Sequence, residues 1–447
     1  EKRYFIMNKS ACELLSFIRQ SPSPFHAVCR MEQELAAGGY EKLYEEDKWE
    51  LREGGKYMVS RNGSALIAFA LPEHFPSHGE RGFLVTASHS DSPTFKIKEH
   101  PEIDAEKKYI KLNVEKYGGM LISPWFDRPL SAAGRLLVKN GSRIETRLVD
   151  IDRDLLMIPS LAIHMDRSAN EGHKYNPQEE LLPLFGGPDS AGKFEKLAAD
   201  AAGVREEDIC GMDLFLYNRM EGTVWGASEE FLSAPRLDDL QCAFASMKGL
   251  LLSENTRQIR IHCVFDNEEV GSLTRQGASS TFLKDTLTRI FDSMGADREA
   301  LPRALASSFM ISADNAHAVH PNYPGKADPV NRPCINGGIV LKHSANQKYT
   351  TDGVTAAVFR SICRKAGVPC QDFANRSDIP GGSTLGNLSI AQAAMRTVDI
   401  GLPQLAMHSS YETAGVKDTE YLIQALRTFY SSDIRVDKDQ IILNGED

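Results

Sequence analysis

The sequence predicts an α/β protein in which a doubly wound, mostly parallel sheet is interrupted by a β-rich insert. Short apolar runs bounded by turn residues recur along the chain, and such runs are typical of buried parallel strands. From Pro235 onward these runs alternate with helical patterns, as in a doubly wound sheet. From about residue 95 to residue 231 the pattern changes to alternating polar and apolar residues, which predicts an inserted domain rich in strands.

The N-terminal part predicts two helices, a hairpin and a buried strand. Residues 10–20 are helix-like and are followed by Ser-Pro-Ser-Pro, and a second helix over 24–37 stops at a Gly-Gly pair. Residues 59–71 form a hairpin about Asn62-Gly63. The apolar run 82–87 is the first buried strand.

The rest of the chain separates into the insert and a second α/β stretch. Alternating runs such as 135–138 and 143–148 indicate strands, and polar residues 165–190 indicate a long loop. An apolar helix is expected at 240–252, and further strands at 259–265, 308–312, 338–341 and 397–402. We therefore predict a discontinuous domain of residues 1–94 and 232–447, split by an inserted domain of residues 95–231.

Composition excludes several classes of protein. The 447 residues carry a formal net charge of −10 without a basic stripe, which argues against nucleic-acid binding. No apolar run approaches the roughly 18 residues of a membrane span, and no signal peptide is expected. The 8 cysteines form no Cys-x-x-Cys pair and are expected to be reduced, mostly buried thiols of a cytoplasmic protein.

The most informative segment is Asp266–Ser272, where Glu268 and Glu269 follow the apolar run 259–265. Charges at the end of a core strand are costly unless something binds them. Other metal-type residues follow strands or precede the helix at 240–252; they are His89, Asp91, Asp238, Asp314 and His408. Ligands of open α/β sheets bind beyond the carboxyl ends of the strands, so these side chains are expected to gather there.

Two histidines and several carboxylates suit zinc, cobalt or manganese. With one bridging carboxylate, the set serves two metal ions about 3.5–4 Å apart, and a spare glutamate can act as general base. Spacing does not decide between Glu268 and Glu269. Each motif alone has an ordinary explanation as a solvated turn, a surface pair or a helix cap, and only their joint placement favours a metal site.

Motifs over nearly the whole chain match one family; they are Ser21–Val28, Ser88–Pro93, Tyr117–Gly119, Trp125–Arg128, Leu161–His164, Pro235–Asp238, Asp266–Ser272, Ser312–Tyr323 and Met407–Glu412. In their order and spacing the chain resembles the aspartyl aminopeptidases, which are two-metal, zinc-dependent aminopeptidases. The resemblance implies that one ion is held by His89 and Asp314, the other by Glu269 and His408, and both by Asp238. It also implies that Glu268 is the general base and that Asp91 clamps His89.

The resemblance adds a role for His164, which carries no local mark and by itself suggests a core or surface histidine. In the family this histidine lies in the inserted dimerisation domain, reaches the neighbouring subunit's active site and helps to hold the oxyanion. The resemblance further implies a homododecamer built from dimers.

The implied substrates are peptides with a free N-terminus, and the family name implies N-terminal Asp or Glu. An acidic side chain needs a local cation, and Lys342 matches a family segment near the substrate pocket; the alternative is a solvated lysine after the strand 338–341. His317 and His320 lie near Asp314 in sequence and either contact substrate or simply pack.

Alternative functions remain open at this stage. They are a neutral-residue aminopeptidase, a carboxypeptidase or N-deacylase in which Lys342 or Arg376 binds a carboxylate, and a non-catalytic scaffold. Because His89 precedes the insert and Asp238 follows it, both insert junctions should converge on the metal site. Metal affinity is therefore expected to depend on docking of the insert.

Overall fold

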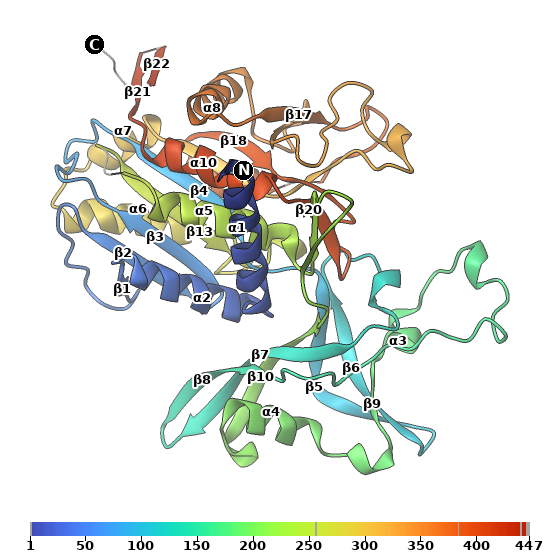
Figure 1. The fold of residues 1–447 in the computed structure, drawn as a ribbon. Helices are drawn as coiled ribbons and strands as arrows, with labels where there is room; N and C mark the ends of the chain where they lie inside the picture. The colour runs from blue at the N-terminus through green and yellow to red at the C-terminus, as the bar shows by residue number, and fades with distance from the viewer. Residues whose placement is uncertain (1, 255–256, 383, 439, 444–447) are drawn as a thin grey trace.

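The computed structural model describes residues 2–254, 257–382, 384–438 and 440–443. The chain forms two lobes (Figure 1). The larger lobe is built on a nine-stranded sheet from the N-terminal and C-terminal parts, and the smaller lobe on a six-stranded sheet from the middle of the chain.

The first elements follow the predicted order. Helices α1 (Lys2–Arg19) and α2 (Pro24–Ala37) are separated by Ser23, whose side chain caps α2 by accepting a hydrogen bond from the His26 amide. Strands β1 (Glu41–Leu43), β2 (Lys56–Arg61) and β3 (Ala65–Ala70) follow. Asn62 and Gly63 both have positive φ, of 59° and 66°, as a tight hairpin turn requires.

The nine-stranded sheet has the order β1-β2-β3-β13-β4-β14-β18-β16-β17. Its remaining strands are β4 (Phe83–His89), β13 (Ile259–Phe265), β14 (Phe309–Ala313), β16 (Ile339–His343), β17 (Cys370–Ala374) and β18 (Arg396–Gly401). The neighbours β13, β4, β14 and β18 run parallel, whereas β3 and β16 join this group antiparallel. The prediction of an α/β fold with a mostly parallel sheet is confirmed.

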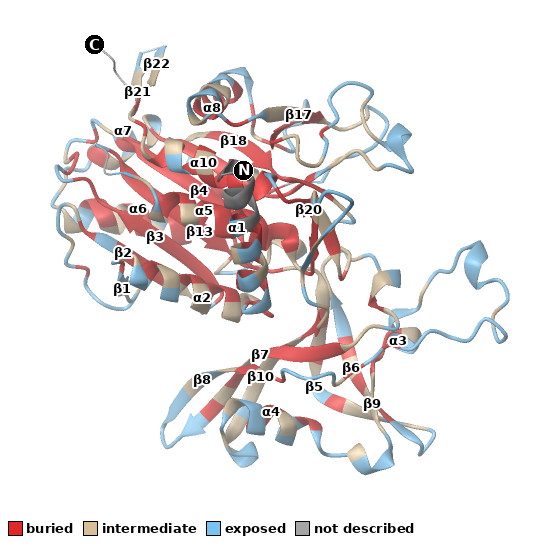
Figure 2. Ribbon diagram, in the orientation of Figure 1, coloured by how far each residue is buried: buried red, intermediate tan, exposed pale blue. Residues whose placement is uncertain are grey.

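Helices cover both faces of this sheet. One face packs against α1, α2, α5 (Leu237–Leu251), α8 (Gly353–Ala366) and α10 (Asp418–Tyr430), and the other against α6 (Phe282–Ser293), α7 (Ala300–Ala306) and α9 (Leu385–Ser389). Along β4, Leu84 packs on the first face and Phe83 and Val85 on the second. All 7 residues of β4 and of β13 are buried, so polar groups can meet ligands only at the strand ends (Figure 2).

The smaller lobe is an antiparallel sheet with its own apolar core. Its strands, in the order β8-β7-β10-β5-β6-β9, are β5 (Thr94–Ala105), β6 (Tyr109–Tyr117), β7 (Leu130–Asn140), β8 (Arg143–Asp150), β9 (Leu184–Gly186) and β10 (Ile209–Asn218). Phe95, Trp125 and Phe194 are buried in this core, and α4 (Phe194–Ala202) packs beside β8. Residues 165–190 are largely irregular, with α3 (Pro177–Glu180) and β9 among them.

A third sheet, of five strands, was not predicted. It is formed, in spatial order, by β11 (Thr223–Trp225), β12 (Phe231–Ala234), β20 (Glu412–Gly415), β19 (Pro403–Leu405) and β15 (Ala316–His317). These strands have two to four residues each, too few for a readable alternation. Strand β11 lies inside the expected insert, yet it pairs with β12, which extends past residue 231. This sheet therefore includes residues from both sides of the expected boundary, and the domain boundaries at 94/95 and 231/232 stay a prediction.

The remaining elements are short. The 3-10 turns are η1 (Ser123–Trp125), η2 (Ala169–Glu171), η3 (Pro188–Ser190), η4 (Glu206–Asp208), η5 (Glu268–Val270) and η6 (Pro324–Lys326), and β21 (Ile434–Asp437) pairs with β22 (Gln440–Leu443). No helix in the described part of the chain has the length and apolarity to span a bilayer.

Arg135 of β7 ties the two lobes together. Its guanidinium donates to the carbonyl oxygen of Asn62 (2.8 Å) and to the Asn62 side-chain oxygen (3.1 Å) in the larger lobe. It lies 4.3 Å from the centre of the Phe25 ring and also donates to Asp213 at 2.9 Å. The smaller lobe is therefore held against the larger by hydrogen bonds and a cation–π contact.

The cysteine prediction is partly wrong. Cys242, Cys263 and Cys363 are buried, but Cys12, Cys210 and Cys334 are exposed. The exposed cysteines lie on the surfaces of α1 and β10 and in the loop before β16, which apolar patterning does not mark as core.

Candidate active site

The predicted site residues converge at the carboxyl ends of the central parallel strands. His89 is the last residue of β4 and pairs in register with Phe265, the last residue of β13. Asp314 directly follows β14, and Asp238 lies in the first turn of α5, where the backbone is not yet helical. The gathering follows from the parallel direction of these strands, which brings their ends to one edge.

His408 reaches this point from a different sheet. The sequence reading attached it to the end of the strand 397–402, but β18 ends at Gly401 and His408 lies in the turn between β19 and β20. His408 has a positive φ of 66°, which turns the chain sharply there. The expected strand-end position is therefore wrong, although the side chain arrives among the others.

Asp238 lies between two imidazoles. His89 Nε2 is 3.7 Å from Asp238 Oδ1 and 3.8 Å from Asp314 Oδ1. His408 Nε2 is 3.3 Å from Asp238 Oδ2 and 3.3 Å from Glu269 Oε1. One oxygen of Asp238 thus faces each histidine, and each histidine has a second carboxylate of its own.

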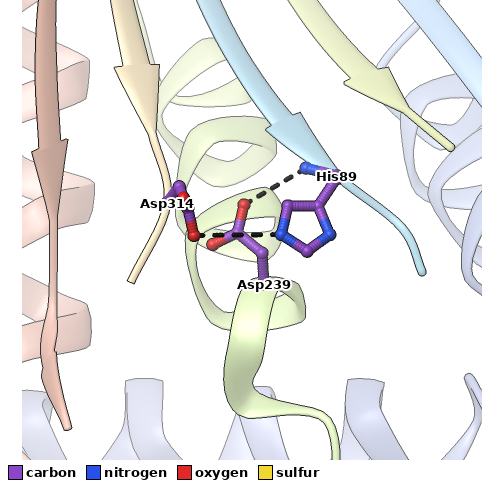
Figure 3. A group of neighbouring side chains, drawn as sticks. All are labelled: His89, Asp239 and Asp314. Carbon is purple, nitrogen blue, oxygen red and sulfur yellow. Dashed lines mark hydrogen bonds and ion pairs between the residues drawn. The ribbon is translucent and has the colours of Figure 1, made fainter. Parts of the chain in front are cut away.

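Asp239, a residue that the sequence reading did not single out, belongs to the same cluster. Its Oδ2 accepts a hydrogen bond of 3.1 Å from the backbone amide of His89, and its carboxylate lies beside His89 and Asp314 (Figure 3). Burial raises the pKa of Asp239 well above its usual range. The Asp238-Asp239 doublet was the only signal, and spacing could not show that both carboxylates point into the site.

Asp91 connects one imidazole to both glutamates. Nδ1 of His89 hydrogen-bonds to the Asp91 carbonyl oxygen at 3.1 Å and lies 3.3 Å from Asp91 Oδ1, which accepts from the Glu268 amide at 3.1 Å. Asp91 Oδ2 accepts from the Glu269 amide at 3.1 Å and from the Tyr117 hydroxyl at 2.7 Å. Asp91 therefore orients the histidine through its carbonyl and carboxylate oxygens, and its carboxylate also holds the backbone that carries the two glutamates.

Glu412 performs a similar task for His408 and was also missed. One of its oxygens accepts from the His408 amide (2.7 Å) and the other from the Asp238 amide (3.0 Å). The ring of His408 is oriented by the carbonyl oxygen of Gly119, 2.6 Å from Nδ1. With Nδ1 occupied in this way, Nε2 is the nitrogen that faces the carboxylates.

The site holds more carboxylates than cations. Burial is the main cause that raises the pKa of Glu268 to about 8 and that of Glu269 to about 7. Although burial opposes protonation, the Asp238 and Glu269 carboxylates raise the pKa of His408 to about 11. These raised pKa values indicate that the cluster favours bound positive charge. Protons supply that charge in the absence of another cation.

The residues present fit a metal centre. Oδ1 of Asp238 is buried and has no hydrogen-bond partner among the described residues, and its nearest imidazole nitrogen is 3.7 Å away. Among the described residues, three groups of side chains have carboxylate and imidazole atoms within 4.8 Å of one another, and one of these groups is Asp238, Glu269 and His408. Imidazole nitrogens and carboxylate oxygens together form a donor set that suits zinc.

Lys342 is neither solvated nor beyond its strand, so the alternative reading of this residue is wrong. It lies within β16, is 3% exposed, and places Nζ 3.4 Å from Asp314 Oδ2. Although burial opposes ionisation of Asp314, Lys342 lowers the pKa of that carboxyl. Its strand β16 lies inside the sheet, between β17 and β18.

The two nearby histidines differ. His317 ends β15 with an exposed side chain, yet desolvation by surrounding atoms and the charge of Lys342 lower its pKa. His317 therefore lies on the open side of the cluster. His320 stacks on Tyr323 with ring centres 5.0 Å apart and accepts from the Asn322 amide, so it packs within its own loop.

His164 is exposed and lies in the smaller lobe, in the loop that leads to α3. This loop projects away from the rest of the chain in Figure 1. Its neighbours Leu161, Ile163 and Met165 are also exposed, by 60%, 48% and 75%.

Comparison with known proteins identifies the family of this chain. Residues 17–430 match the family described as aminopeptidase I zinc metalloprotease (M18). The chain is 48% identical over 429 residues to a probable M18 family aminopeptidase 2 of Clostridium acetobutylicum, covering 94% of this chain and 98% of that protein.

Solved structures show the same fold. In a cryo-EM structure of the Ape4 and Nbr1 complex, one chain superposes with a TM-score of 0.92 at 36% identity, covering 95% of this chain and 86% of that one. The mApe1 dodecamer of S. cerevisiae has a TM-score of 0.83 at 30% identity, with 95% and 96% covered. The chain therefore belongs to the M18 family of zinc metallo-aminopeptidases.

Proposed function

We propose that this protein removes N-terminal Asp and Glu residues from peptides at a site that holds two zinc ions. The single observation that carries the proposal is the position of Asp238, with one carboxylate oxygen facing each histidine. His89 and Asp314 would hold one ion, Glu269 and His408 the other, and Asp238 both. When bound, such a pair lowers the pKa of water and polarises the scissile carbonyl group.

Glu268 is the proposed general base and acid. It would take a proton from the attacking water and give it to the leaving amino group as the peptide bond breaks. The raised pKa of Glu268, caused mainly by burial, suits a carboxyl that must both accept and release a proton near neutral pH. Its backbone amide is held by Asp91, so the side chain starts from a fixed point.

The assembly is part of the proposal. We place His164 at the active site of a partner subunit, where it would stabilise the oxyanion, in a homododecamer built from dimers. Its exposure beside exposed apolar residues supports a contact with another chain, as does the dodecameric state of the yeast relative. The cytoplasm is the proposed location, which suits a protein with buried cysteine thiols such as Cys242 and Cys263.

Acidic specificity rests on Lys342. Lys342 belongs to β16, and its ammonium group is buried beside the Asp314 carboxylate. This ammonium group is the cation that we propose for an acidic substrate side chain. Because Asp314 already pairs with it, Lys342 balances one carboxylate before any substrate binds, and a second carboxylate must compete for it.

The function is tested with aspartyl, glutamyl and leucyl chromogenic amides, with an acetylated peptide as the blocked control. We expect acidic amides to be preferred, acetylation to abolish cleavage, and metal analysis of protein purified without chelators to find two zinc ions per chain. A preference for the leucyl amide contradicts the acidic specificity and leaves a neutral-residue aminopeptidase.

The role of Lys342 in specificity must be tested by comparing two substrates, because Lys342→Ala also disturbs Asp314. The informative quantity is the kcat/KM for the aspartyl amide divided by that for the leucyl amide, because a damaged metal site lowers both. We expect this ratio to fall about tenfold or more in Lys342→Ala. Lys348→Ala, which removes an exposed lysine of the same segment, is the matched control.

A further inference from the structure

The turn after β6 brings the smaller lobe into contact with the site. Tyr117 is the last residue of β6, and its hydroxyl contacts Asp91 beside His89. Gly119, in the turn that follows, contacts His408 directly. None of these residues was assigned a role from the sequence. The contact near His89 is made by the Tyr117 hydroxyl group, and the contact with His408 is made by the Gly119 carbonyl oxygen.

The Tyr117 hydroxyl holds the carboxylate that orients His89. It donates to Asp91 Oδ2 at 2.7 Å and accepts from the Asn267 side chain at 2.8 Å. Asn267 immediately precedes Glu268, so one hydroxyl connects the Asp91 clamp to the segment that carries the general base. The ring is fixed separately by an edge-to-face contact with Phe215, with centres 5.7 Å apart.

The following glycines place the carbonyl that orients His408. Gly119 O lies 2.6 Å from Nδ1 of His408, and the Leu121 amide donates back to the His408 carbonyl at 3.0 Å. Gly118 has a positive φ of 77°, and a Cβ atom there would lie 3.1 Å from Cβ of Glu269. At Gly119 an added Cβ would meet nothing within 4 Å.

We infer that residues 117–119 of the smaller lobe are positioning residues for both halves of the metal site, with Tyr117 acting through Asp91 and Gly119 through its carbonyl oxygen. The inference rests on the proposed two-zinc function. It also supplies a physical route by which docking of the smaller lobe would control metal affinity. Partners that orient metal ligands in this way are worth about 10–100-fold in affinity or activity.

The first test compares two tyrosines. Tyr117→Phe removes the hydroxyl and keeps the ring packing, and Tyr217→Phe is the matched control because its hydroxyl donates to Asp150 at 2.7 Å, in the same lobe. Zinc affinity is measured by competition with a chromophoric chelator, and unfolding temperature on the zinc-free proteins. We expect Tyr117→Phe to bind zinc about tenfold more weakly at an unchanged zinc-free unfolding temperature. Tyr217→Phe should bind zinc as the parent does.

The second test compares two glycines of positive φ in the smaller lobe. Gly118→Ala should weaken zinc binding, since it strains a positive φ and presses on Glu269. Gly141→Ala, in the turn between β7 and β8, strains a positive φ of 61° but places its Cβ near no other atom, and it should bind zinc as the parent does. Parental zinc affinity in both Tyr117→Phe and Gly118→Ala overturns the inference, as do equal losses in the variants and their controls. A parent protein that binds fewer than two zinc ions instead contradicts the proposed function, so the two failures are distinguishable.

Discussion

The main sheets of the two lobes differ in where their polar side chains can lie. Strands β4 and β13 of the larger lobe are buried along their whole length, because helices cover both faces. Strands β6 and β8 of the smaller lobe carry exposed and half-buried residues along much of their length. A sheet covered on both faces can present reactive groups only at its ends. The proposed metal ligands gather at one such edge, and the open sheet contributes Tyr117, which contacts Asp91.

The charges differ in the same way. In the smaller lobe, Asp213 has two cations, with Lys96 Nζ at 2.8 Å and Arg135 Nε at 2.9 Å. In the larger lobe, the Asp238 carboxylate lies 3.3 Å and 3.7 Å from imidazole nitrogens and forms no ion pair with a lysine or arginine among the described residues. The first carboxylate is satisfied by the protein itself and the second is not. Unbalanced buried charge therefore distinguishes a metal centre from a structural ion pair.

The largest expected effect is a loss of kcat when a glutamate of the larger lobe is replaced, compared with the same substitution in the smaller lobe. Glu268→Gln should lower kcat by about 10²–10⁴-fold, because it removes the proposed proton carrier, with zinc content unchanged. Glu207→Gln makes the same change at an exposed glutamate of the smaller lobe and should leave kcat unchanged. Cleavage by Glu268→Gln at the parental rate would remove the glutamate from the mechanism.

The next prediction asks whether the smaller lobe also serves a neighbouring chain. His164→Ala should lower kcat by about 10²–10³-fold, as loss of an oxyanion donor does. His173→Ala, at an exposed histidine that contacts Glu180, is the control. If His164 acts in a partner subunit, mixing and reassembling His164→Ala with Glu268→Gln chains should restore activity that neither has alone. A mixture that stays inactive contradicts this arrangement.

A smaller effect is expected at the contact between the lobes. Arg135→Ala should lower the free energy of unfolding by about 2–3 kcal/mol, since charge-assisted hydrogen bonds to Asn62 and Asp213 are lost together. Arg147→Ala, at an exposed arginine of the neighbouring strand β8, should cost less than about 1 kcal/mol. Urea unfolding measures both, and equal losses would show that Arg135 does not join the lobes.

The smallest effect is a pH dependence. Although burial opposes ionisation, Lys96 and Arg135 lower the pKa of Asp213 below its ordinary value of 3.8. The folded state therefore gains stability from this carboxylate above that value and loses it as the pH falls further. Asp213→Asn should cost about 1 kcal/mol at pH 7 and flatten the acid decline of the zinc-free protein. An unchanged acid decline contradicts this assignment.

The pattern of apolar residues along the chain predicted the strands that helices cover on both faces of the sheet. The runs 82–87, 259–265 and 308–312 correspond to β4, β13 and β14, since burial on both faces leaves a continuous apolar signal. Helix α2 and the β2–β3 hairpin were marked by Gly38-Gly39 and by Asn62-Gly63. The five-stranded sheet was invisible, because its strands are too short for any period to appear.

What the sequence determined by itself is the set of chemical groups and, for His89, Asp314 and the two glutamates, their place at or just after the end of a strand. Tertiary structure alone decided that His408 arrives from another sheet, that Asp239 also faces His89, and that Lys342 is buried against Asp314. The physical reason is that strand and helix periods are local properties of the chain. The approach of two groups far apart in sequence depends on how whole sheets pack, and only the folded chain contains that information.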